Sequence, residues 1–163
     1  MLATDLILEF HVIVSLVGLA SGLIVVVGLL SGKPMRGWTA LFLGTTILTS
    51  ATGFLLPPFV FDPPRVVGLI SLALLALAVA AAYGFHLANA WRWVYVVTAV
   101  AALYLNAFVG VVQAFQKLSF LQPLAPTQSE PPFVIAQVAV LAAFIVLGAL
   151  AVRRFHPEIR AGG

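Results

Sequence analysis

Residues 6–30 read LILEFHVIVSLVGLASGLIVVVGLL, an apolar run long enough to cross the hydrocarbon core of a bilayer as a helix, which takes about 20 residues. The run nevertheless contains a carboxylate, Glu9, and an imidazole, His11. An ionisable side chain in such a segment is costly, and it commonly marks a functional site. The stretch therefore raises two questions: how the chain is threaded, and what these two side chains do.

The composition of the chain excludes an ordinary soluble domain. Of its 163 residues, 63% are hydrophobic and 8% are charged, against roughly 45–50% and about 25% in soluble proteins. A soluble fold of this length leaves too much of its surface in water to hide so many apolar side chains. We therefore expect one membrane domain over residues 1–163, with the lipid bilayer as its solvent. The absence of cysteine excludes disulfides and thiolate chemistry.

Four further apolar runs follow the first. We predict an all-α bundle with five transmembrane spans, at about 6–30, 38–56, 66–88, 93–116 and 133–152. The breaks between runs contain residues that end helices, such as SGKPMRG at 31–37 and the paired prolines at 57–58 and 63–64. The third run is rich in alanine (LALLALAVAAAYG, 72–84), which favours a central, tightly packed helix.

The basic residues predict the orientation, because cytoplasmic loops carry an excess of Lys and Arg. If the amino terminus is outside, the outer segments contain only Arg65 and Lys117. The inner segments then contain Lys33, Arg36, Arg92, Arg153, Arg154 and Arg160. We therefore predict an N-out, C-in topology. The basic residues are scattered between apolar runs and form no patch, so we expect no binding to nucleic acid.

Polar side chains from four of the predicted spans gather in the outer half of the membrane. We expect His11, Asn106 and Gln113 to line a cavity open to the outside, and Glu9 and Lys117 to form an ion pair at its mouth. The candidate ligand-binding residues are Glu9, His11, Thr49, Thr52, Asn106, Gln113, Lys117 and Gln137. The alternative is a role in packing alone, with Glu9 stabilised by the dipole of its helix and Asn106 forming an interhelical hydrogen bond.

The chain contains no nucleotide-binding, hydrolase or metal-ligand motif. We therefore predict no enzyme activity, no metal site and no cofactor. One haem cannot take both His11 and His86 as ligands, because these residues belong to opposite sides of the membrane in the predicted topology. The alternative to the absence of a cofactor is a haem b with a single histidine ligand, or a quinone.

Two features suggest partners besides the bilayer. The spacing of Gly18 and Gly22 is that of a GxxxG helix contact, which favours a homodimer or a larger membrane complex, although such glycines also pack helices within one chain. The long loop LSFLQPLAPTQSEPP (118–132) is stiffened by prolines. It is interpreted as a connector, with a lid or a docking loop as alternatives.

Four segments carry a resemblance to a known group. They are HVIVSLVGLASGL (11–23), GWTALFLGTTILTSATGF (37–54), RWVYVVTAVAALYLNAFVGVVQAFQK (92–117) and LAPTQSEPPF (124–133). Together they resemble small multi-pass membrane proteins of bacteria. The resemblance covers most of the chain and implies a bacterial inner (cytoplasmic) membrane. It implies no activity, cofactor or catalytic residue.

Three hypotheses for the function follow. The first is the binding or permeation of a small ligand or ion through an outward-facing polar cavity, and it requires His11, Asn106 and Gln113 to converge. The second is an accessory or assembly subunit of a larger membrane complex. The third is a redox protein that binds haem or quinone.

Overall fold

The fold is a bundle of helices. The computed structural model of the protein describes residues 2–57 and 62–157, and these contain no strand. The elements are α1 (Leu2–Leu30), α2 (Arg36–Gly53), α3 (Pro63–Val79), the π-helical turn η1 (Ala80–Gly84), α4 (Trp91–Lys117), the 3-10 turn η2 (Gln122–Leu124) and α5 (Pro131–Arg154). The predicted all-helical fold is confirmed.

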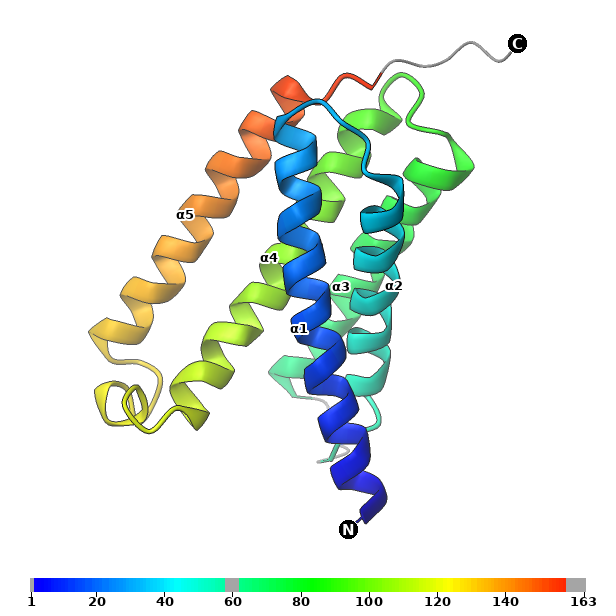
Figure 1. Ribbon diagram of the computed structural model, residues 1–163. Coiled ribbons are helices and arrows are strands. Elements are labelled where there is room, and N and C mark those ends of the chain that lie inside the picture. Colours follow the sequence, from blue (N-terminus) through cyan, green and yellow to red (C-terminus); the bar gives the residue numbers. More distant parts are fainter. Residues whose placement is uncertain (1, 58–61, 158–163) are drawn as a thin grey trace.

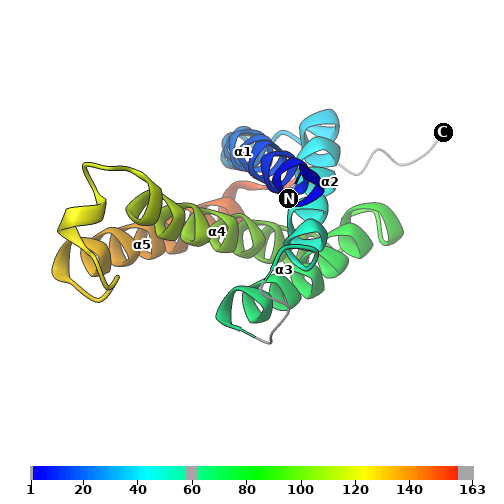
Figure 2. The same cartoon turned by 90° about the horizontal axis from the view of Figure 1, so that it is seen from below.

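Successive long helices run in opposite directions, so the start of α1 and the end of α5 lie at opposite ends of the bundle (Figure 1). We call these the amino end, where α1 begins, and the carboxyl end, where α5 stops. α1 and α2 lie side by side, and α3 follows against α2 and α4. Seen along the bundle, α5 lies on the outer side of α4, away from α2 and α3 (Figure 2).

The central helix is α4, which contacts all four other long helices. The prediction that the alanine-rich third run would be central is therefore wrong: α3 buries only Ser71, Leu75 and Ala78. The physical reason is that lipid tails are as apolar as the bundle interior, so an alanine gains little by being buried. Its presence in a membrane helix thus says little about which helices surround it.

Four of the described helical segments are long and apolar enough to cross a membrane: Thr4–Leu30, Pro63–Gly84, Trp91–Lys117 and Pro131–Arg154. α2 has 18 residues but is not among them, because many of its residues are Thr, Ser or Gly and its hydropathy is therefore too low. It nevertheless runs antiparallel beside α1 over most of its own length (Figure 1).

The observed helix bounds extend some predicted ones because proline is tolerated in the first turn of a helix, where its missing N–H has no partner to lose. α3 begins at Pro63 and not at 66, with Asp62 as its N-cap. α5 begins at Pro131 and not at 133. The third span ends at Gly84, earlier than the predicted 88, because His86, Leu87 and Asn89 have positive φ and cannot continue the helix.

The loop between α4 and α5 is organised by one carboxylate. Glu130 accepts hydrogen bonds from the Thr127 hydroxyl (2.8 Å) and from the backbone N–H groups of Thr127 and Ser129 (both 3.1 Å). Desolvation raises the pKa of Glu130, but these hydrogen bonds outweigh it and hold the pKa below its ordinary value. Gln128 donates to the Val112 carbonyl (3.2 Å) and ties the loop to α4. These contacts support the interpretation of the loop as an ordered connector.

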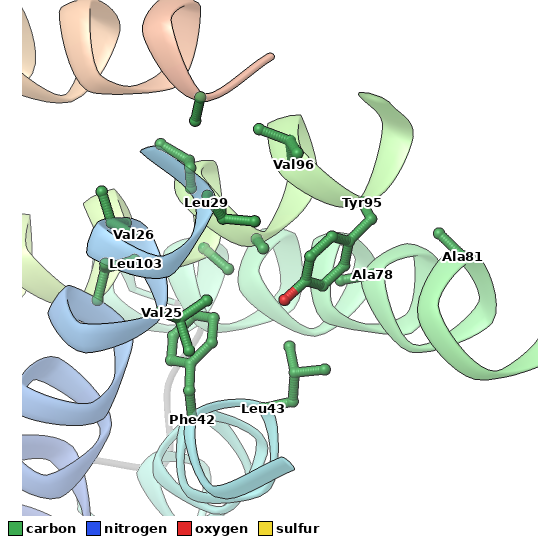
Figure 3. Close-up of a cluster of buried hydrophobic side chains, with 14 of the residues drawn as sticks. Val25, Val26, Leu29, Phe42, Leu43, Ala78, Ala81, Tyr95, Val96 and Leu103 are labelled. Carbon is green, nitrogen blue, oxygen red and sulfur yellow. The ribbon is translucent and has the colours of Figure 1, made fainter. Parts of the chain in front are cut away.

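The apolar core lies in the carboxyl half of the bundle (Figure 3). Its largest members are almost completely buried, and they come from all five long helices or their ends. They include Val25, Leu29, Phe42, Leu43, Leu75, Val96, Leu103 and Phe155. Near the middle of the bundle, Phe42, Leu43 and Leu103 form a buried apolar layer between α2 and α4.

Two glycines let α1 approach α2 and α4. A Cβ atom on Gly22 would lie 2.5 Å from Leu103 Cδ1 and 2.9 Å from Phe42 Cδ2, and one on Gly18 would lie 3.1 Å from the Thr46 hydroxyl. The face that contains Gly18 and Gly22 is thus occupied within the chain. The GxxxG spacing had suggested that this face binds a second copy of the chain, but the face is not free to do so.

We expect Gly22→Leu to lower the free energy of unfolding in detergent by about 1–3 kcal/mol, because the new side chain overpacks the contact with Phe42 and Leu103. The matched control is Gly44→Leu, since a Cβ on Gly44 meets nothing within 4 Å. Thermal or denaturant unfolding followed by circular dichroism would measure both. Equal effects of the two substitutions would contradict this account of α1 packing.

Candidate functional site

A cavity of about 540 Å³ lies at the amino end of the bundle, between α1, α2, α3 and α4. Its volume is within the range of small-molecule sites, roughly 300–1,000 Å³. The polar side chains that line it are Thr4, His11, Ser15, Thr46, Thr49, Ser50, Asp62, Arg65, Ser71, Asn106, Gln113 and Gln116. Apolar side chains such as Leu8, Phe54 and Leu105 complete the wall. The predicted convergence of His11, Asn106 and Gln113 on one cavity is thus observed.

His11 joins α1 to α2. Its Nδ1 lies 2.9 Å from the Thr52 hydroxyl oxygen, and that hydroxyl donates its own hydrogen to the Leu48 carbonyl (2.7 Å). Since the hydroxyl hydrogen is used, His11 Nδ1–H is the donor to Thr52. In the neutral imidazole with its proton on Nδ1, Nε2 is a hydrogen-bond acceptor. Gly53 leaves room for the ring, because a Cβ there would lie 3.5 Å from His11 Cε1.

Asn106 joins α4 to α1 by two hydrogen bonds. Its Oδ1 accepts from the Ser15 hydroxyl (3.1 Å), and its Nδ2 donates to the Ser15 carbonyl (3.3 Å). Asn106 is 8% exposed, so an amide without partners would be costly at this position. The second Nδ2 hydrogen is left over, since the amide carries two and one is used. It is a donor at the edge of the cavity.

The hydroxyl groups on α2 present lone pairs to the cavity. Thr46 and Thr49 donate to the carbonyls one turn earlier, of Phe42 (2.7 Å) and Thr45 (2.9 Å). Across the α2–α3 contact, the Ser50 and Ser71 hydroxyls lie 3.2 Å apart. Threonine commonly satisfies its hydrogen within its own helix in this way. The lining therefore combines acceptors from hydroxyls and imidazole with donors from the amides.

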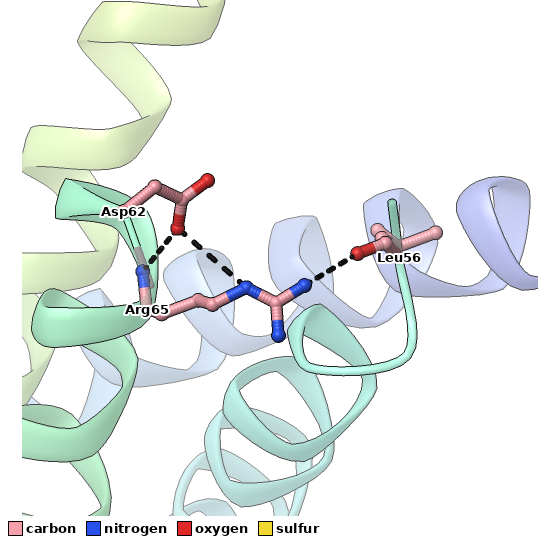
Figure 4. Close-up of polar contacts among 3 residues, drawn as sticks. All are labelled: Leu56, Asp62 and Arg65. Atoms are coloured by element: carbon pink, nitrogen blue, oxygen red, sulfur yellow. Dashed lines mark hydrogen bonds and ion pairs between the residues drawn. The ribbon is translucent and has the colours of Figure 1, made fainter. Parts of the chain in front are cut away.

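The charges at the rim of the cavity neutralise each other (Figure 4). Asp62 Oδ1 lies 3.6 Å from Arg65 Nε and accepts from the Arg65 backbone N–H (3.3 Å). The Arg65 guanidinium also donates to the Leu56 carbonyl (3.0 Å), which ties the end of α2 to the start of α3. The charges of Asp62 and Arg65, the two charged side chains of the lining, therefore cancel.

Four of the candidate residues, Glu9, Thr52, Lys117 and Gln137, lie outside the cavity wall. Glu9 and Lys117 are exposed, and the described residues include no ion pair between them, so the predicted pair at the mouth is not observed. Gln137 lies at the α4–α5 contact, where its Nε2 donates to the Phe108 carbonyl (3.2 Å). The structure therefore does not bring Gln137 to the site. Thr52 supports His11 without lining the cavity itself.

The fourth wall of the cavity comes from α3. The sequence analysis named no residue of this helix as a candidate and named Gln137 of α5 instead. Ser71 and the Asp62–Arg65 pair belong to this wall. The available signal was Ser71 itself, a hydroxyl inside the long apolar run that begins at residue 66. Its depth matches that of Ser50 in the preceding run, if the two helices are antiparallel neighbours.

The histidines do not form a shared cofactor site. His11 lines the cavity at the amino end, whereas His86 lines a different cavity at the carboxyl end. Within residues 2–57 and 62–157 there is no cluster of three or more His, Asp or Glu side chains that could hold a metal ion. The arrangement at the amino end is suited to hydrogen bonding of a ligand.

Comparison with known proteins adds no family: the chain matches no protein-family model, no curated protein and no solved structure.

We expect a coupling free energy of about 0.5–1.5 kcal/mol between Ser15→Ala and Asn106→Leu in a double-mutant cycle, the range of interhelical hydrogen bonds in membranes. The measurement is reversible unfolding in detergent. As a control, Thr45→Val paired with Asn106→Leu should give almost no coupling, because the Thr45 hydroxyl donates to its own helix. Independent effects of Ser15 and Asn106 would argue against their hydrogen bond.

Proposed function

We propose that the protein is an integral membrane protein of the bacterial inner membrane, with five spans and the amino end of the bundle outside. The alternating helix directions, with the start of α1 and the end of α5 at opposite ends of the bundle, support an odd number of crossings (Figure 1). The described acidic residues, Asp5, Glu9, Asp62 and Glu130, belong to the amino end. The basic residues Lys33, Arg36, Arg92, Arg153 and Arg154 belong to the carboxyl end, which the positive-inside rule assigns to the cytoplasm.

A transmembrane α2 is compatible with its polarity because its hydroxyl groups are satisfied inside the helix. Thr45, Thr46, Thr49 and Thr52 each donate to a carbonyl one turn earlier. An internally bonded hydroxyl avoids most of the cost of an unsatisfied polar group in lipid. At 1.5 Å per residue, the 18 residues of α2 reach about 27 Å, close to the thickness of the hydrocarbon core.

We further propose that the cavity at the amino end binds a small, uncharged, amphipathic molecule. The observation that carries this proposal is the combination of compensated charge with convergent hydrogen-bonding groups: His11 Nε2 as an acceptor and the Asn106 and Gln113 amides as donors. The two charged side chains of the lining, Asp62 and Arg65, are paired with each other, so the site offers no unpaired charge from this pair to a charged ligand. The apolar wall, which includes Leu8, Phe54 and Leu105, suits a hydrophobic body.

Binding is favoured over permeation because two helices, α2 and α4, pass from the cavity into tightly packed apolar residues. On α2, Thr46 lines the cavity, and Phe42 and Leu43, which lie one turn closer to the carboxyl end of the bundle, are buried. On α4, Asn106 lines the cavity and Leu103 is buried. This apolar layer leaves no polar path between the two ends of the bundle.

No catalytic step is assigned to the site. Ser15 is one turn from His11, but its hydroxyl donates to Asn106 and the imidazole donates to Thr52. The serine is thus not activated by the histidine.

Among small, uncharged, amphipathic molecules, a quinone is the ligand that we favour for testing. Its two carbonyl oxygens can accept hydrogen bonds from the amide groups of Asn106 and Gln113.

Five spans predict that cysteines at successive turns react from alternating sides of the membrane. Because the chain has no cysteine, the single variants Ser31→Cys, Leu55→Cys, Ser119→Cys and His156→Cys report without background. In intact cells, an impermeant maleimide should label positions 55 and 119 and not positions 31 and 156. Labelling of positions 31 and 55 from the same side would show that α2 does not cross.

We expect native mass spectrometry from mild detergent to show a small-molecule adduct, or binding of an added short-chain ubiquinone, in the wild-type chain. His11→Leu and Asn106→Leu should each weaken this binding about tenfold or more, the effect of losing one buried hydrogen bond or more. The control is Glu9→Gln, which changes an exposed residue outside the cavity wall.

A wild-type chain that neither retains an adduct nor binds the quinone would contradict the proposed function. Equal binding by the Asn106→Leu and Glu9→Gln variants would place the ligand elsewhere.

A further inference from the structure

A second cavity, of about 780 Å³, lies at the carboxyl end of the bundle. Its walls come from the end of α1, the start of α2, the turn η1, the first turns of α4 and the segment that follows α5. The polar and charged side chains that line it are Lys33, Arg36, Thr39, Tyr83, His86 and Tyr95. No carboxylate from the described part of the chain lines it. The cavity is therefore positively charged, since Lys33 and Arg36 line it.

The two cations of this cavity have no protein partner among the described residues. Lys33 and Arg36 are exposed, and neither takes part in an ion pair or a side-chain hydrogen bond there. Arg92 at the same end behaves differently, because its guanidinium donates to the Val152 carbonyl (3.1 Å) and to that of Phe155. The charge of Lys33 and Arg36 is therefore available to a ligand.

The floor of the cavity is polar and rigid. The Tyr95 hydroxyl lies 3.1 Å from the Thr39 hydroxyl, and the two residues are 2% and 9% exposed. α2 starts at Arg36 without a capping side chain, so the N–H groups of its first turn point toward this end without a partner from a cap. Hydroxyl and N–H donors beside two cations form a set that recognises phosphate oxygens.

The opposite wall is held by an irregular backbone. The chain leaves α3 through the π-helical turn Ala80–Gly84 and then places His86 (φ 50°) and Leu87 (φ 59°) in the left-handed region. Residues other than glycine rarely adopt this backbone conformation. π-Turns and left-handed residues occur often at functional sites. This local path brings His86 to the cavity wall, facing the segment that contains Lys33 and Arg36.

We propose that this cavity binds an anionic phosphate group. Lys33 and Arg36 supply the charge, and the first turn of α2 and the Tyr95–Thr39 pair supply hydrogen-bond donors. An anionic phospholipid headgroup and a free phosphate both carry this chemistry. The site is independent of the amino-end cavity, because the apolar layer around Phe42 and Leu103 separates the two. Basic pockets between helices at a membrane surface commonly hold such headgroups.

The test measures dissociation constants of the full chain in neutral detergent by native mass spectrometry. The probes are short-chain phosphatidylglycerol, short-chain phosphatidylcholine and inorganic phosphate. We expect the double variant Lys33→Gln/Arg36→Gln to bind phosphatidylglycerol about tenfold more weakly than the wild type, since each cation near an anionic lipid contributes a severalfold effect. The matched control, Arg153→Gln/Arg154→Gln, removes two exposed cations at the same end that do not line the cavity.

The outcomes separate the sources of the phosphate group. Binding of phosphatidylglycerol that inorganic phosphate does not displace supports a lipid headgroup site. Displacement by inorganic phosphate, lost in the same double variant, supports a site for the free anion. Equal weakening in the two double variants would overturn the proposal, because a general surface charge would then account for binding. Equal affinity for phosphatidylcholine and phosphatidylglycerol would overturn it as well.

Discussion

Hydrocarbon offers no hydrogen-bonding partner, so the polar groups inside the bundle must find partners in the chain itself. Most of the hydroxyls meet this constraint within their own helix, as Ser21 does with the Val17 carbonyl (2.6 Å). Two connections between helices, His11 to Thr52 and Asn106 to Ser15, lie in the amino half. They tie α1 to α2 and α4 around the amino-end cavity. Close packing does the same work in the carboxyl half, where α1 approaches its neighbours at Gly22.

The helices could be predicted from the sequence because a membrane span has a strong signal in length and composition. The observed bounds differ by a few residues, mainly at Pro63 and Pro131, where proline starts a helix and does not precede it. Which helix lies at the centre of the bundle and which helices lie at its edge could not be predicted. Their burial depends on pairwise contacts such as that of Gly22 with Leu103, and composition carries little of that information in lipid.

The depth of the polar side chains could be predicted, but their direction around each helix could not. His11, Asn106 and Gln113 share one cavity, as expected, whereas Gln137 lies at a similar depth on the other side of α4. A rotation of α5 about its axis, or a different neighbour for α4, would have changed this without any change in hydropathy. Lys33 and Arg36 were interpreted only as signals of orientation, because nothing in the sequence indicated that η1 and α4 would close a cavity beside them.

α5 buries only Gln137 and Ala151 within the chain, and it contributes no residue to the wall of the amino-end cavity. Two polar clamps hold it: Gln137 on the Phe108 carbonyl at one end, and Arg92 on the Val152 and Phe155 carbonyls at the other. The wall of the amino-end cavity is consequently built by α1 to α4. Sequence change can accumulate on the outward face of α5, or adapt that face to neighbours in the membrane, without altering the side chains that line the cavity.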